Sequence, residues 1–149
     1  MSLLQKLGED LKENLKGRRE SQTATLRMLL SAIHNREIEK RSKNGSLELS
    51  DEEVIEVLRK EAKKRREAAD IYKKAGRSEL ARRENEELQF IQTYLPQLMS
   101  PGDIETVVDK VVAGGIKDFG LVMKAVMAEV KGKAEAGVVS KIVKAKLGA

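Results

Sequence analysis

Apolar residues recur every three or four positions along most of this sequence, a spacing that places side chains on one face of an α-helix. The first two series, which precede Gly17 and Arg41, are Leu4, Leu7, Leu11 and Leu15, then Leu26, Leu29, Leu30, Ile33 and Ile38. No segment alternates apolar and polar residues in the manner of a strand. The sequence therefore predicts an all-α fold in which each apolar series faces a core.

A turn at Asn44-Gly45 is expected to separate the second helix from the third, whose start is well marked. Ser50 followed by Glu53 is the pattern of a capping box, and Leu49 and Val54 can form a hydrophobic staple around it. The third helix is expected to reach about residue 75. A fourth helix should start near residue 78 and direct inward Leu80, Leu88, Ile91 and Leu95.

The segment Pro96–Gly102 predicts a break between two domains. Pro96 stops the fourth helix, while Ser100 is a candidate N-cap followed by Pro101 at the first helical position, where proline is tolerated. Met99 can form a staple with Ile104. We therefore predict an N-terminal four-helix domain over residues 1–98 and a C-terminal three-helix domain over residues 99–149.

The C-terminal segment from residue 116 to residue 149 is strongly basic, with seven lysines against three acidic residues. This local charge of +4 accounts for most of the net charge of +5 of the whole chain. The two helices predicted there are expected to bury Phe119, Val122, Met123, Val126, Met127 and Val130, then Val139, Ile142, Val143 and Leu147. The residues expected to bind a polyanion are Lys124, Lys131, Gly132, Lys133, Lys141 and Lys144.

A second basic run, Lys63–Arg66, is a weaker candidate for RNA contact. Four successive residues point around the whole helix, and Glu61 and Glu67 flank the run, so the sequence favours a structural role. Stacking of bases is not expected, because the chain has two Phe, two Tyr and no Trp, and several of these belong to the apolar series.

Residues that could carry catalysis are scarce. The chain has no cysteine, and His34 is its single histidine, so we expect no thiol nucleophile, no metal site and no cofactor. The tripeptide Asp118-Phe119-Gly120 is interpreted as a helix start with Asp118 as the N-cap. The glutamates at 84, 86 and 87 alternate with arginines, which is typical of a solvated surface. With no predicted signal peptide or membrane-spanning segment, the expected location is the cytoplasm.

Several motifs in the order of the chain resemble the YqeY-like protein family. They are TLRMLLSAI at 25–33, KRREAADIY at 64–72, AGRSELA at 75–81, YLP at 94–96, VMKAVM at 122–127 and VKGK at 130–133. The resemblance implies an all-helical fold of a four-helix and a three-helix bundle. It also implies a relation to the tail of the B subunit of the glutamine-dependent aspartyl/glutamyl-tRNA amidotransferase, and to the appended N-terminal domain of some glutaminyl-tRNA synthetases.

The resemblance implies a ligand for the basic surface, since the amidotransferase tail belongs to the part that engages tRNA and the amide chemistry lies in other domains. Lys131-Gly132-Lys133 stands where the family commonly has Lys-Gly-Arg, and Lys124, Lys141 and Lys144 stand at positions that are often basic. Two positions depart from the family pattern. Glu135 replaces an aspartate, which is a better N-cap, and Gly137 replaces a residue that is often lysine.

Our hypothesis from the sequence is a helical module without an active site that binds tRNA or another structured RNA, or a tRNA-charging complex. An alternative is an accessory component of glutamine-dependent carbon–nitrogen ligation that docks to an aminoacyl-tRNA synthetase or an amidotransferase. A third class, a protein of anionic membrane surfaces, is less favoured. The apolar faces of the last helices are needed for a small core, which leaves little to insert into lipid.

Overall fold

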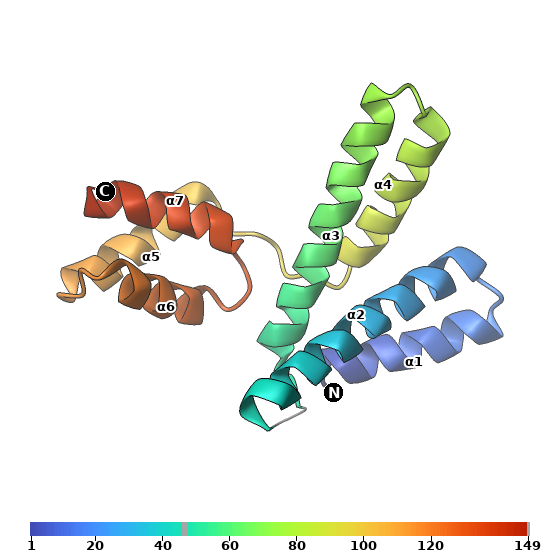
Figure 1. Ribbon diagram of the computed structural model, residues 1–149, viewed down its shortest axis with the longest axis horizontal. Helices are drawn as coiled ribbons and strands as arrows, with labels where there is room; N and C mark the ends of the chain where they lie inside the picture. Colours follow the sequence, from blue (N-terminus) through green and yellow to red (C-terminus); the bar gives the residue numbers. More distant parts are fainter. Residues whose placement is uncertain (46–47, 149) are drawn as a thin grey trace. The chain divides into compact units, whose positions relative to one another are not determined.

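The computed structural model describes residues 1–45 and 48–148, and over these residues the chain forms seven helices and no strand (Figure 1). The predicted all-α fold is confirmed. The helices are α1 (Leu3–Lys16), α2 (Glu20–Asn44), α3 (Asp51–Lys74), α4 (Ser78–Gln92), α5 (Pro101–Ala113), α6 (Phe119–Val130) and α7 (Ala136–Leu147).

The chain divides into two compact units, Met1–Leu95 and Pro96–Ala149. The expected boundary lay three residues later, after residue 98 rather than 95. Ala149, the end of the expected C-terminal domain, lies outside the described residues.

The first unit consists of two helical hairpins, with α1 packed mainly on α2 and α3 mainly on α4 (Figure 1). Its core is formed where the hairpins meet and contains Leu7, Leu26, Leu29, Ile33, Leu49, Val54, Val57, Leu58, Ala62 and Ile91. Beyond this core the α3–α4 hairpin continues, with the small side chains of Ala69 and Ala81 buried. Small residues allow two helix backbones to approach closely.

The predicted helix starts are confirmed in atomic detail. Ser50 Oγ accepts a hydrogen bond from the backbone N–H of Glu53 (3.2 Å), and Glu53 Oε1 accepts one from the backbone N–H of Ser50 (3.2 Å). Leu49 and Val54 are both buried in the core beside this cap. A second capping box, between Ser2 and Gln5, starts α1 and was not predicted. At the end of α2, Gly45 takes the left-handed conformation with φ of 72°, while Ser46 and Leu47 lie outside the described residues.

The fourth helix ends earlier than Pro96 requires. It stops at Gln92, and the next residues form tighter turns in which Thr93, Tyr94 and Leu95 donate to carbonyls three residues back at 3.2, 3.0 and 3.1 Å. The residue before a proline disfavours helical dihedral angles, so the chain leaves the α-helix before it reaches the ring. Leu95 nevertheless packs against the core, as expected.

In the first unit, two residues of the predicted buried series are exposed, and for these the prediction was wrong. Leu15 is 46% exposed in the last turn of α1, and Ile38 is 51% exposed on α2. Since α2 has 25 residues and α1 has 14, α1 can cover only part of α2, which accounts for the exposure of Ile38. Helical spacing identifies a face but cannot say how far the neighbouring helix extends.

The second unit is a set of three helices in which each helix contacts the other two. Its core contains Ile104, Val108, Val122, Val126, Val130, Ala134, Val139 and Val143. Ser100 Oγ accepts a hydrogen bond from Asp103 N–H (3.1 Å), and Pro101 occupies the first turn of α5, as predicted. Met99 packs on this core and donates its backbone N–H to the Lys133 carbonyl (2.8 Å). The chain before α5 is thereby fixed to the turn between α6 and α7.

Candidate nucleic-acid interface

The turn Lys131-Gly132-Lys133 connects α6 to α7, and hydrogen bonds hold its backbone. Lys131 N–H donates to the Met127 carbonyl (3.3 Å), and Lys133 N–H donates to the Val130 carbonyl (3.0 Å). Lys131 and Gly132 both take the left-handed conformation, with φ of 48° and 78°. Both lysine side chains are exposed. The turn therefore presents two cations to solvent from a fixed backbone.

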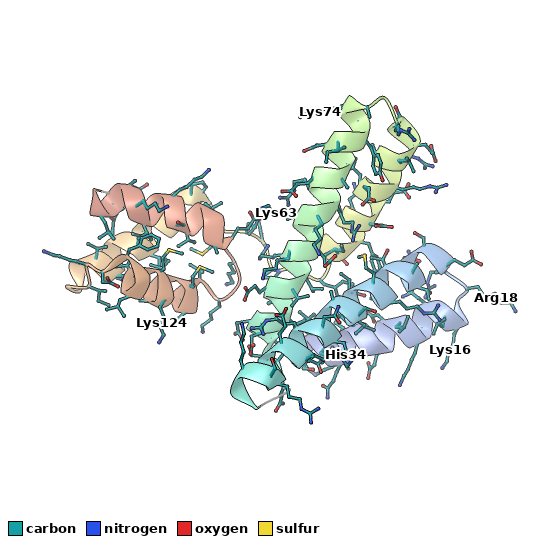
Figure 2. The ribbon with its side chains drawn as sticks, viewed as in Figure 1. Lys16, Arg18, His34, Lys63, Lys74 and Lys124 are labelled. Atoms are coloured by element: carbon teal, nitrogen blue, oxygen red, sulfur yellow. The ribbon has the colours of Figure 1, made fainter. Side chains whose placement is uncertain are left out.

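Lys124 and Lys141 project from the two helices that this turn connects, on the sides away from the core. Each lies two residues from buried valines of its own helix, a rotation of roughly 200°. Figure 2 shows Lys124 pointing away from the second unit. Among the described residues, no carboxylate is within 4.0 Å of the ammonium groups of Lys124, Lys131, Lys133 or Lys141.

Lys144 lies at the opposite end of α6 from Lys131. Its ammonium group stands 5.8 Å from the centre of the Phe119 ring, a cation–π distance. Phe119 is the first residue of α6, and Lys131 follows its last residue, so the helix separates Phe119 from Lys131 by about 18 Å. The predicted residues thus form no single cluster. The structure brings Lys131, Gly132 and Lys133 together and places Lys144 elsewhere on the unit.

The prediction that Phe119 is buried was wrong. Its side chain is 39% exposed and lies outside the core of the second unit, whereas Val122, Val126 and Val130 are buried. The N-cap prediction beside it is confirmed, because Asp118 Oδ2 accepts a hydrogen bond from Leu121 N–H (3.1 Å). Helical spacing alone could not reveal that the neighbouring helices leave Phe119 partly exposed at the start of α6.

Two further lysines of this unit are neutralised by neighbouring helices. Lys146 Nζ lies 2.6 Å from Glu105 Oε1 and 3.1 Å from Asp109 Oδ1 on α5, and these carboxylates raise the pKa of Lys146 above its ordinary value. Lys110 Nζ pairs with Glu129 Oε1 at 3.1 Å. Ion pairing therefore separates these lysines from the exposed candidates, although all of them look alike in the sequence.

The start of α7 is capped less well than the start of α6. Glu135 occupies the N-cap position with extended backbone angles, and its side chain makes no capping hydrogen bond. This agrees with the expectation that glutamate caps less firmly than aspartate. Gly137 is exposed, and nothing lies within 4 Å of where its Cβ would stand. The first turn of α7 thus lacks the N-cap side-chain hydrogen bond that Asp118 gives to α6.

The basic run Lys63–Arg66 is engaged in ion pairs, in line with the structural role that its sequence favoured. Lys63 lies 4.0 Å from Glu67, and Lys64 lies 3.1 Å from Glu61. Arg65 turns inward: its guanidinium nitrogens lie 3.2, 3.5 and 3.7 Å from carboxylate oxygens of Glu61, Glu84 and Glu87. The run therefore offers little free positive charge.

The prediction that the glutamates of α4 form a solvated surface holds only in part. Glu84 and Glu87 have side chains that are 19% and 35% exposed, because they turn toward Arg65. Burial and the nearby charge of Glu84 raise the pKa of Glu87 above its ordinary value, while Arg65 opposes this. Glu86 remains on the surface and pairs with Arg82 at 3.1 Å.

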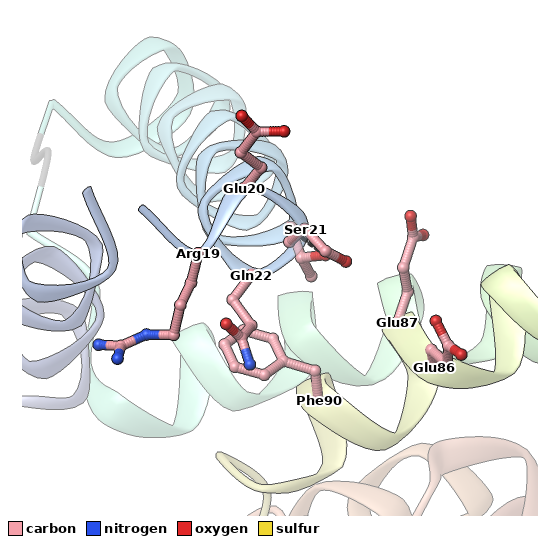
Figure 3. A pocket seen from close by; sticks show the side chains of 8 residues that line it. Arg19, Glu20, Ser21, Gln22, Glu86, Glu87 and Phe90 are labelled. Carbon is pink, nitrogen blue, oxygen red and sulfur yellow. Dashed lines mark hydrogen bonds between the residues drawn. The ribbon is translucent and has the colours of Figure 1, made fainter. Parts of the chain in front are cut away.

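A cavity of about 410 Å³ lies between the start of α2 and α4 in the first unit (Figure 3). It is lined by Arg19, Glu20, Ser21, Gln22, Thr25, Glu86, Glu87 and Phe90. The guanidinium of Arg19 points toward α1, where its Nε donates to Asn14 Oδ1 (2.7 Å). Carboxylates thus dominate the charge of this cavity, which makes it unsuitable for phosphate groups.

His34 is exposed on α2 (Figure 2). Over the described part of the chain, no three His, Asp or Glu side chains are grouped as metal ligands would be. The described helices also include none that is long and apolar enough to cross a membrane.

Relatives of this chain include an uncharacterized protein of Schizosaccharomyces pombe, 33% identical over 87 residues, 58% of this chain and 67% of that protein. Two others are named altered inheritance of mitochondria protein 41, mitochondrial. The one from Vanderwaltozyma polyspora is 32% identical over 106 residues, 70% of this chain and 55% of the relative. The one from Eremothecium gossypii is 34% identical over 92 residues, 62% of this chain and 48% of the relative. The chain thus spans about half to two thirds of these relatives' lengths.

The mitochondrial names of these relatives contradict the cytoplasmic location expected from the sequence, and that prediction was wrong. A chain without cysteine suits several compartments, so this feature cannot identify one.

The sequence model of the YqeY-like protein family matches residues 4–147, which is nearly the whole chain. The match includes every segment on which the resemblance rested, together with all six candidate binding residues. This chain therefore belongs to the YqeY-like protein family.

Proposed function

We propose that this chain is a non-catalytic helical module that binds structured RNA, with tRNA as the first candidate, through the lysines of its second unit. The observation that carries the proposal is the turn Lys131-Gly132-Lys133. Its two lysines are exposed and have no carboxylate partner among the described residues, while backbone hydrogen bonds fix the turn from which they extend. Phosphate groups are the complementary ligands for such a turn.

The contrast among the lysines supports this interpretation. Lys110 and Lys146 are paired with carboxylates, whereas Lys124, Lys131, Lys133 and Lys141 carry charges that a polyanion can neutralise. Contacts of this kind position a nucleic acid without identifying its sequence. The resemblance to the tail of the tRNA-dependent amidotransferase subunit also favours tRNA over other RNA.

The test is a titration of the purified chain against deacylated tRNA, an RNA duplex and anionic vesicles at one salt concentration. We expect saturable binding of tRNA, weaker binding of the duplex and no defined binding of the vesicles. Equal binding of all three ligands would indicate diffuse attraction to a basic protein. Absence of RNA binding by the folded chain would leave docking to an amidotransferase or a synthetase as the better proposal.

A further inference from the structure

Phe119 is an aromatic residue whose side chain is partly exposed to solvent. It is 39% exposed at the first position of α6, and it does not belong to the core of its unit. Leu121, at 58%, and Ile116, at 36%, are exposed within three residues of it. These three residues, together with Lys117 and Lys144, form what we call the Phe119 surface.

Cations adjoin this apolar surface. Lys144 on α7 reaches across to place its ammonium group 5.8 Å from the centre of the Phe119 ring. Lys117, two residues before Phe119, is exposed. The acid between them, Asp118, uses Oδ2 to cap Leu121 N–H (3.1 Å). The surface thus combines one accessible aromatic ring with two lysines.

We infer that the Phe119 surface binds an unpaired nucleotide of the RNA, with the base stacked on the ring and the adjoining phosphates on Lys117 and Lys144. This inference rests on the proposed function and identifies which part of the RNA binds at the start of α6. Proteins that bind single-stranded nucleic acid commonly combine aromatic faces, on which bases stack, with cations that contact the phosphates. The long side chain of Lys144 is flexible and can exchange the ring for a phosphate when a base arrives.

The Phe119 surface and the turn Lys131-Gly132-Lys133 lie at opposite ends of α6, so they can contact different parts of one RNA. Phe119 begins α6 and Lys131 follows its end, about 18 Å away. One RNA molecule can therefore place paired backbone on the turn Lys131-Gly132-Lys133 and an unpaired end on the Phe119 surface. Phosphate contact depends on salt, whereas stacking of a base depends little on salt, so the contribution of the Phe119 ring can be measured separately from that of the lysines.

The experiment compares two RNAs, a blunt hairpin and the same hairpin with a short unpaired 3′ extension, against Phe119→Ala, Phe119→Leu and wild type. We expect the wild type to prefer the extended hairpin. Both variants should lose about fivefold to a hundredfold in affinity for that RNA and almost nothing for the blunt hairpin. The slope of log affinity against log salt should not change, and circular dichroism should remain helical.

Leu121→Ala is the matched control, because it removes an exposed apolar side chain from the same helix turn without removing a π system. It should bind both hairpins as the wild type does. Phe119→Trp should retain the preference, and its fluorescence should be quenched by the extended hairpin and not by the blunt one.

Three results would overturn the inference. Unchanged binding of the extended hairpin by Phe119→Ala would mean that the ring makes no contact. Full binding by Phe119→Leu, or an equal loss from Leu121→Ala, would mean that the surface makes a general apolar contact, as a protein partner would. Each of these results leaves the proposed function intact. If the wild type bound neither hairpin, both the inference and the proposed function would be overturned.

Discussion

The hydroxyl of Tyr94 donates a 2.6 Å hydrogen bond to Asp10 Oδ2, which links the turn after α4 to α1 across 84 residues of sequence. Burial and the acceptor carboxylate raise the pKa of Tyr94 above its ordinary value, so the phenol keeps its proton. The ring also packs edge-on against Phe90, with 5.6 Å between ring centres. Tyr94 therefore fixes the end of the first unit, just before the break at Pro96.

Replacing Tyr94 by phenylalanine should lower the free energy of unfolding by about 1 to 2 kcal/mol, because it removes a hydrogen bond to a charged acceptor and keeps the ring. Urea denaturation measures the loss. Asp10→Asn keeps an acceptor oxygen and should cost less. If Tyr94→Phe were as stable as the wild type, the bond would contribute nothing beyond what water supplies.

Alanine at both Lys131 and Lys133 should weaken tRNA binding regardless of RNA sequence. If the five candidate lysines contact phosphates, log affinity should fall with log salt at a slope of roughly −3 to −5, and the double variant should reduce that slope by about 1 to 2. Titrations at several salt concentrations give the slope. Helicity should not change, because both residues lie outside the helices.

The matched control for this pair is alanine at both Lys63 and Lys64, which removes the same charge from a site where Glu67 and Glu61 already neutralise it. It should affect tRNA binding less. Equal losses from the two double variants would show that attraction is diffuse and that the turn is no defined site.

The variant Lys131→Gly should distinguish the effect of the left-handed backbone on stability from the effect of the lysine charge on tRNA binding. Lys131 has a φ of 48°, and a side chain in the left-handed region costs about 1 kcal/mol that glycine avoids. We expect the variant to unfold at a higher temperature and yet to bind tRNA more weakly. A variant that is less stable than the wild type would show that the lysine side chain makes a stabilising contact.

Glu53→Gln should destabilise the first unit at neutral pH and not in acid. Lys40 Nζ donates to Glu53 Oε1 (2.7 Å), and this bond with the Ser50 N–H holds the pKa of Glu53 below its ordinary value of 4.5. A carboxyl with a lowered pKa stabilises the fold above its ordinary pKa and loses that effect as the pH falls through its folded pKa. We expect a loss of about 1 kcal/mol at neutral pH that shrinks as the pH falls below the ordinary pKa of Glu53 and is absent once the carboxyl is protonated in the folded protein. Glutamine keeps the oxygen that accepts from Ser50, so the difference reports the charge. A loss that persists in acid would point to packing.

Much of the fold follows from local interactions that are visible in the sequence. The caps at Ser50, Ser100 and Asp118 were predicted because an N-cap bonds to residues two or three positions away, inside its own segment. The helices followed from periodicity for the same reason. The membership in the YqeY-like family followed from motifs spread along nearly the whole chain.

The candidate binding residues were chosen from their place on the predicted helices and from the family resemblance, and neither criterion shows which lysines are paired with a carboxylate. Lys146 meets Glu105 and Asp109 on another helix, while Lys124 has no carboxylate partner among the described residues. Whether a lysine keeps a free charge depends on how neighbouring helices are rotated against one another, which no single segment determines.

The sequence by itself determined where helices begin, which face of each helix is apolar and where the positive charge is concentrated, because these properties arise within one turn or two of chain. Tertiary structure alone decided that Phe119 reaches solvent, that Arg65 turns toward Glu84, and that Lys131 and Lys144 lie at opposite ends of α6. These outcomes depend on how long and in which direction a neighbouring helix runs, and the partners that decide them are distant in sequence.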